Sequence, residues 1–254
     1  MIENDLRLFE FPFFFKGEEK KCALALIRTD NFSAEDAVDY LSDNELKRMR
    51  SISREKAKIC YCFGRVVAKK ALGMLIDGLI YRDLDVGNEK SGCPTTGNCD
   101  FSVSITHTDE VAACLAYGKE FSFGTDIEKM NENRIDALRY VISGKEPIPN
   151  DLKSLTVAWT LKESLSKALK CGFGLPFEEF ELSEFRGNGE FFVCSYARHP
   201  EFFGAATVFE NNSYAAAFPR ELFSDLPTPE SAAEHPLVKK FRRAIFRGRN
   251  SDDS

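Results

Sequence analysis

Two long helix-like segments, each set among short strand-like segments, constrain the fold of this chain most strongly. The first covers about residues 33–79 and follows a strand-like run at 22–27. The second covers about 152–170 and lies between two groups of strand-like runs. Short strands with turn-like connectors favour antiparallel pairing. The sequence therefore predicts an α+β fold of two similar halves, each a long helix packed on a small antiparallel sheet.

The remaining strands and the helix start follow from local patterns. Ser42 and Glu45 form a capping-box pattern that predicts the start of a helix. Residues 85–100 are rich in turn-forming residues and predict a loop. The other expected strands are 101–106, 111–117 and 121–127, which we predict to form an antiparallel meander, followed by 177–182, 190–197, 205–209 and 214–218.

The end of the chain leaves two interpretations open. Residues 239–249 are basic, and the favoured interpretation is a partly ordered tail with a solvated basic face. The alternative is a short helix whose apolar face is made by Leu237, Phe241, Ala244 and Ile245. We expect an N-terminal half at 1–119, a C-terminal half at 120–222 and this tail at 223–254.

Composition excludes few classes of protein. A length of 254 residues allows one large domain or two small ones, and the net charge of −6 argues against a protein that binds nucleic acid over its whole surface. Eight cysteines without a C-x-x-C pair give no zinc pattern. Residues 1–20 do not resemble a signal peptide, and no apolar run reaches the ~20 residues of a membrane span. We therefore expect a cytoplasmic protein with reduced thiols.

An acidic pair ends one of the expected strands. Alternation along a strand places Asp126 and Glu128 on one face and turns Ile127 to the opposite layer. Two adjacent carboxylates repel unless a cation lies between them, so the pair is a candidate site for a hard divalent ion. The competing interpretation is a solvated acidic strand end.

The second long helix carries a matching face. Trp159, Glu163 and Lys167 are four residues apart and therefore stack on one side of the helix. Glu163 and Lys167 could be a surface ion pair worth about 0.3–0.5 kcal/mol. Alternatively, Glu163 is a third metal ligand and Lys167 a cation beside transferring phosphates, and spacing does not separate the two.

Five segments, in order, resemble the motifs of 4′-phosphopantetheinyl transferases. These segments are Leu41-Ser42-x-x-Glu45-x-x-Arg48, Val103-Ser104-Ile105-Thr106-His107-Thr108, Gly124-x-Asp126-Ile127-Glu128, Trp159-x-x-Lys162-Glu163-x-x-x-Lys167 and Gly172-x-Gly174-Leu175. The chain length resembles the longer, monomeric branch, the surfactin-synthetase-activating type, whose two halves are related by pseudo-twofold symmetry. The resemblance therefore implies a monomer with that symmetry.

The resemblance implies a reaction and a metal. Such enzymes transfer the phosphopantetheine arm of coenzyme A to a serine of an apo acyl or peptidyl carrier protein and release adenosine 3′,5′-bisphosphate. By resemblance, Asp126, Glu128 and Glu163 bind Mg²⁺, and Glu163, directly or through a metal-bound water, takes the serine proton. Lys167 stabilises the departing phosphate by charge or donates a proton to it. Coenzyme A is then the substrate, and neither nucleic acid nor a membrane is expected as a partner.

The same resemblance assigns coenzyme A contacts. His107 would contact the 3′-phosphate, with Thr106 in place of the usual serine beside it. Lys56 and Arg65 lie on the first long helix, where the family has basic residues that contact the phosphates. His107 could instead be a structural histidine, and Arg65 a structural ion-pair partner.

The chain also departs from the family pattern. The basic residue that the family often has before a proline is missing at Cys93-Pro94, so Lys90 would only partly substitute for it. Lys162 would assist in binding, although its offset by one residue turns it away from Lys167. Three rivals remain: another metal-dependent transferase of phosphorylated groups, a non-catalytic relative that binds coenzyme A or carrier protein without transfer, and a basic tail that contacts nucleic acid or a membrane.

Overall fold

The structure, a computed structural model, describes residues 5–28, 32–89, 92–142, 144–187, 189–223 and 228–246. The chain divides into two compact units, unit 1 at Met1–Phe121 and unit 2 at Ser122–Ser254. Both combine helices with an antiparallel sheet, which confirms the predicted α+β class. The pseudo-twofold symmetry stays a prediction. Within the described residues, no helix combines the length and apolar content needed to cross a bilayer.

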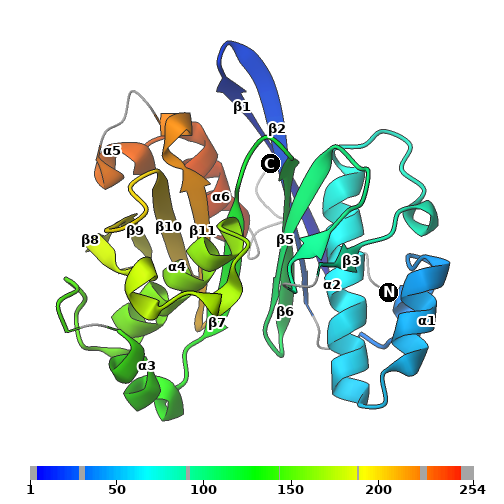
Figure 1. Cartoon of the computed structure of the whole chain (residues 1–254), viewed down its shortest axis with the longest axis horizontal. Coiled ribbons are helices and arrows are strands. Elements are labelled where there is room, and N and C mark those ends of the chain that lie inside the picture. The colour runs from blue at the N-terminus through cyan, green and yellow to red at the C-terminus, as the bar shows by residue number, and fades with distance from the viewer. Residues whose placement is uncertain are drawn as a thin grey trace, which may run out of the picture. The chain divides into compact units, whose positions relative to one another are not determined.

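Unit 1 is a four-stranded sheet covered by one long helix (Figure 1). Its elements are β1 (Leu6–Phe15), β2 (Glu18–Arg28), α1 (Asp43–Ser51), α2 (Glu55–Gly73), the short pair β3 (Gly87–Asn88) and β4 (Pro94–Thr95), β5 (Phe101–His107) and β6 (Val111–Gly118). The sheet order is β1-β2-β6-β5, and α2 packs on β2, β6 and β5. Small sheet residues such as Ala25, Cys114 and Ala116 admit the larger Phe63 and Val67 of the helix.

Local signals explain two features of unit 1. The predicted capping box is confirmed, because the Ser42 hydroxyl accepts from the Glu45 N–H and the Glu45 carboxylate accepts from the Ser42 N–H. Strand β1 was not predicted. It pairs with β2 through a tight turn in which Lys16 and Gly17 both have positive φ, 51° and 82°. This turn geometry matches the twist of a hairpin, but Lys-Gly is a weak signal for it compared with Asn-Gly.

Unit 2 is a five-stranded sheet with helices on both faces (Figure 1). Its elements are β7 (Gly124–Lys129), α3 (Ile135–Val141), α4 (Leu152–Ala168), β8 (Leu182–Gly187), β9 (Phe191–Tyr196), β10 (Phe202–Phe209), β11 (Asn212–Pro219), α5 (Pro229–Ala233) and α6 (Pro236–Phe246). The order is β7-β11-β10-β9-β8. Ala217 lies in the cluster beneath α4, whereas the ring of its neighbour Phe218 lies against Phe241 of α6. Neighbouring strand residues point to opposite faces, so α4 and α6 cover opposite sides.

Two strand predictions are wrong. The segment 121–127 was expected to continue a meander with 111–117, but β7 pairs with β11 in unit 2. Strand β6 cannot pair with this segment, because β2 and β5 already pair with its two edges. Residues Phe177–Phe180 form a 3₁₀ turn instead of a strand, and β8 begins only at Leu182. Phe177 and Phe180 are three residues apart, which fits the 3₁₀ period.

The C-terminal segment is also more ordered than the favoured interpretation allowed. Leu237, Phe241, Ala244 and Ile245 are buried on α6, as the alternative predicted. Their spacing of four, seven and eight residues forms one helical stripe, and the core of unit 2 takes up that stripe. The basic residues beyond 246 lie outside the described residues.

Candidate active site

The candidate site is built where α4 lies directly on β7. A Cβ added to Gly124 would lie 1.9 Å from the Ser164 carbonyl oxygen and 2.6 Å from the Ala168 nitrogen. Glycine is therefore what allows the helix to approach the strand this closely. The close approach brings the same strand face, with Asp126 and Glu128, up to the helix, as strand alternation predicts.

This contact gives a stability prediction. Gly124→Ala should destabilise the protein by about 1–3 kcal/mol, because the added methyl must push α4 away from β7. Gly144→Ala is the matched control, since a Cβ there meets no atom within 4 Å. Urea unfolding of the two variants checks the difference. Equal unfolding midpoints would show that the helix yields without cost.

Asp126 and Lys167 meet across this contact. The Lys167 ammonium lies 2.7 Å from Asp126 Oδ1, and the aspartate is 5 % exposed. The second carboxylate oxygen, Oδ2, is also a buried atom. The structure therefore brings together the first predicted metal ligand and the predicted phosphate-stabilising cation.

Glu128 is held by two different donors. The Trp159 indole donates to Oε1 at 2.9 Å, and the Arg134 guanidinium lies 2.5 Å from Oε2. Trp159 is itself packed beside the Phe177 ring, with ring centroids 6.1 Å apart. Trp159 and Lys167 thus both face β7, which confirms that they share one helix face.

Glu163 lies one helical turn from Trp159 and one from Lys167, and its pKa is raised. Burial, followed by the negative charges of Asp126 and Glu128, raises its pKa from 4.5 to about 7, while Lys167 and Arg134 oppose the rise. The folded protein therefore binds a proton here that the unfolded chain releases near pH 4.5. This group stabilises the fold at low pH, and its contribution is lost as the pH rises from about 4.5 to about 7.

The donor set fits a divalent cation. Asp126, Glu128 and Glu163 supply only oxygens, and the raised pKa of Glu163 shows that the other two carboxylates act on it. Within the described residues, however, no three acidic, histidine or cysteine groups already form a metal cluster. Lys167 and Arg134 hold two of the carboxylates instead.

Lys162 has a separate position. Its side chain is 1 % exposed and its ammonium lies 2.7 Å from the carboxylate of Glu146, which is 2 % exposed. The Glu146 carboxylate also accepts a hydrogen bond from the Leu182 N–H at 2.8 Å. The ammonium is turned into the interior of unit 2, so the predicted contact with coenzyme A would require this pair to break.

The other predicted coenzyme A residues lie in unit 1. Thr106 is buried and His107 exposed at the end of β5. Lys56, in the first turn of α2, lies 2.8 Å from Asp109, which follows His107 by two residues. The structure thus brings Lys56 to the turn after β5.

Arg65 lies further along α2. Its guanidinium stacks over the Tyr61 ring at 4.5 Å and donates to the Asn88 side chain, which in turn donates to the Gly92 carbonyl. Arg65 therefore contacts the segment that leads to Lys90. Lys90 itself lies outside the described residues.

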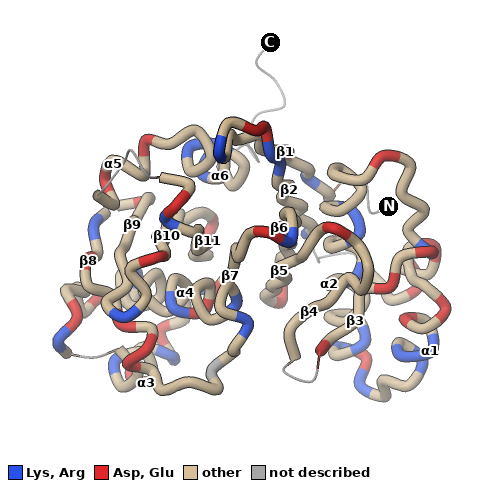
Figure 2. The backbone as a smooth tube through the Cα atoms, turned by 45° about the horizontal axis from the view of Figure 1, so that its top comes forward, with Lys and Arg blue, Asp and Glu red and all other residues tan. Residues whose placement is uncertain are grey.

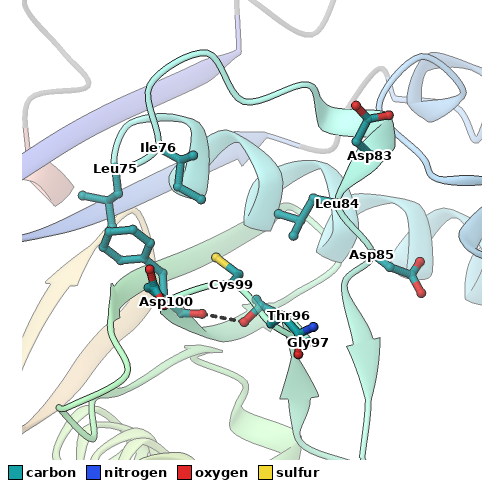
Figure 3. A pocket seen from close by; sticks show the side chains of 11 residues that line it. Leu75, Ile76, Asp83, Leu84, Asp85, Thr96, Gly97, Cys99 and Asp100 are labelled. Atoms are coloured by element: carbon teal, nitrogen blue, oxygen red, sulfur yellow. Dashed lines mark hydrogen bonds between the residues drawn. The ribbon is translucent and has the colours of Figure 1, made fainter.

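Unit 1 also contains a cavity of about 540 Å³ beside the end of α2 (Figure 3). Leu75, Ile76 and Leu84 give it an apolar wall, and Asp83, Asp85 and Asp100 bring carboxylates. Of the residues assigned to coenzyme A, none that the structure describes lines it. Its carboxylates would repel phosphates, so we do not place the nucleotide there. Figure 2 shows charges of both signs interspersed along each unit, without one dominant basic region.

One family model matches the segment that contains the candidate site. The model of the 4′-phosphopantetheinyl transferase superfamily matches residues 122–219, from just before β7 to the end of β11. This segment falls within the superfamily. No curated protein matches the chain. The match supports phosphopantetheinyl transferase activity in general, and the matched segment contains Asp126, Glu128, Glu163 and Lys167.

Two residues of the candidate site and its surroundings were missed by sequence reasoning. Arg134 follows Glu128 by six residues in a polar segment, where no periodic pattern marks it. Glu146 lies in the same segment, yet it is almost completely buried. Buried charges in irregular segments leave no signal in local sequence, because the partner that makes burial possible is distant in the chain.

Proposed function

We propose that the protein transfers the 4′-phosphopantetheine group of coenzyme A to a serine hydroxyl of an apo carrier protein. The observation that carries the proposal is the placement of Asp126, Glu128, Glu163 and Lys167 at one helix–strand contact inside the matched segment. In the reaction, the serine oxygen forms a bond to the phosphorus that carries pantetheine. The bond from that phosphorus to the adenosine bisphosphate breaks, and adenosine 3′,5′-bisphosphate leaves.

We propose that Asp126, Glu128 and Glu163 hold Mg²⁺. When bound there, the ion would supply positive charge to the pyrophosphate as negative charge develops on the leaving group. The chain's own residues do the rest. Glu163 would also take the serine proton. Lys167 is poised to neutralise the departing phosphate.

The nucleotide contacts remain proposals from the resemblance. Lys56, Arg65, Thr106 and His107 would bind the nucleotide end of coenzyme A, with Lys90 as a further cation. Their support is that the Lys56–Asp109 pair lies beside the end of β5 and that Arg65 reaches the segment before Lys90. Membership of the longer branch, and with it a monomeric state, is proposed from chain length.

An intact-mass assay tests the transfer. The full chain, coenzyme A and Mg²⁺ are incubated with apo carriers from fatty-acid, polyketide and peptide synthesis. We expect the mass of one phosphopantetheine group on a single serine of at least one carrier, and none when EDTA removes the metal. A chain that binds coenzyme A by calorimetry but modifies none of the panel would be a non-catalytic relative, and the proposed transfer would be wrong.

A further inference from the structure

Both carboxylate oxygens of Glu128 accept hydrogen bonds, Oε1 from Trp159 and Oε2 from Arg134. The two partners differ in how easily they could leave. Trp159 projects from the rigid helix α4 and packs beside Phe177. The Arg134 side chain is 44 % exposed and carries a full positive charge.

Hydrogen bonds also fix the backbone around Arg134. It ends the short 3₁₀ helix Glu132–Arg134, which the Asn131 side chain caps. Just before this turn, the Met130 N–H donates to the Asn211 carbonyl at 2.9 Å. The backbone before Arg134 is therefore held to the turn between β10 and β11. The long Arg134 side chain can move between Glu128 and solvent.

We propose that Arg134 is the internal counter-ion of Glu128, and that a divalent cation must displace it to use this carboxylate. Arg134 thereby lowers the cation affinity of the site. The inference rests on the proposed metal role of Glu128. A partly exposed ion pair is worth less than about 1 kcal/mol, so a divalent ion can break it. The guanidinium released in this way needs no new protein partner, because water solvates it.

Two contributions set the expected increase in cation affinity. Arg134→Gln removes the competing pair, and it also removes a positive charge that repels the incoming cation. Together these should tighten cation binding by about threefold to tenfold. Arg139→Gln is the matched control. The Arg139 side chain is also 44 % exposed, but it pairs with Asp136 and Asn150 and not with a proposed ligand.

The single tryptophan of the chain gives a direct readout, since Trp159 donates to Glu128. The full-length protein is titrated with Mn²⁺ at constant ionic strength, following Trp159 emission, with calorimetry as the second measurement. We expect Arg134→Gln to bind Mn²⁺ about threefold to tenfold more tightly than the wild type, and Arg139→Gln within about twofold of it. In a Glu128→Gln background only the repulsion by the Arg134 charge remains, and solvent screens it at this exposed side chain, so Arg134→Gln should change affinity by less than twofold.

The outcomes separate the two proposals. Wild-type Mn²⁺ binding with unchanged or weaker binding by Arg134→Gln overturns the inference alone. So does a full-sized gain that persists in the Glu128→Gln background, because Arg134 would then act only through general charge. No binding to any variant in either measurement overturns both the metal site and the inference, and the mass assay reports separately on transfer.

Discussion

Replacing Lys162 with methionine is expected to lower the free energy of unfolding by about 3–5 kcal/mol. Methionine keeps the volume of the side chain but leaves the Glu146 carboxylate at 2 % exposure without its ammonium. The lost charge partner cannot be replaced by water at such burial. Urea unfolding monitored by circular dichroism measures the effect.

Two comparisons make this result specific. Lys153→Met is the matched control on the same helix, because Lys153 is exposed and donates to the Gly189 carbonyl at 3.3 Å, not to a buried carboxylate. It should change stability by less than about 0.5 kcal/mol. Adding Glu146→Gln to Lys162→Met should recover part of the loss, since glutamine removes the buried charge and still accepts the Leu182 N–H. A Lys162→Met protein as stable as Lys153→Met would mean that Glu146 finds another partner or reaches solvent.

The same arrangement occurs a second time. In unit 1, Lys69 of α2 pairs with Glu45 at 2.5 Å, both almost fully buried, and Glu45 accepts the Val86 N–H at 2.8 Å. In each unit, a lysine of the long helix meets a glutamate from before the helix, and that glutamate holds a backbone N–H from after it. The strand order is also similar, because β6 returns to pair with β2 and β11 returns to pair with β7. These are features of each unit taken separately, and the pseudo-twofold symmetry of the two halves stays a prediction.

Local sequence patterns predicted the elements whose formation depends on neighbouring residues. The capping box at Ser42, the long helix at about 152–170 and the strands β9, β10 and β11 were predicted, because caps and periodicity act over a few residues. Strand partners were less predictable. The segment 121–127 has the composition of a strand, but nothing in it specifies pairing with β11, some 90 residues later. Pairing depends on which edges the rest of the sheet leaves open.

The sequence predicted which residues form the candidate site better than it predicted the residues that pair with them. Strand alternation and helical spacing brought Asp126 and Glu128 opposite Trp159 and Lys167, as observed. Spacing could not reveal that Lys162, next to Glu163, turns into the core, because its partner Glu146 comes from an irregular segment. For the same reason Arg134 was missed, although it contacts a predicted ligand.

Asp126→Asn and Glu163→Gln should each lower kcat/KM for phosphopantetheine transfer by on the order of 10²–10³-fold. Both changes keep the shape of the side chain and remove one negative charge of the proposed cation site. Asparagine can still accept from Lys167 at 2.7 Å, so the Asp126→Asn protein should stay folded. Asp136→Asn is the matched control, because Asp136 is 90 % exposed in the same unit and pairs with Arg139 instead of contacting a proposed ligand.

Cation binding separates a ligand from a group that acts only in the chemical step. If Asp126 and Glu163 hold the ion, both variants should also weaken Mn²⁺ binding measured at Trp159, whereas Asp136→Asn should match the wild type. Glu163 has a second test built into it, since its pKa of about 7 reflects repulsion by Asp126 and Glu128 as well as burial. Asp126→Asn removes part of that repulsion and should therefore lower the pKa of Glu163 in the metal-free protein. Wild-type rates in both variants would show that the three-carboxylate site is wrong even if the protein transfers phosphopantetheine.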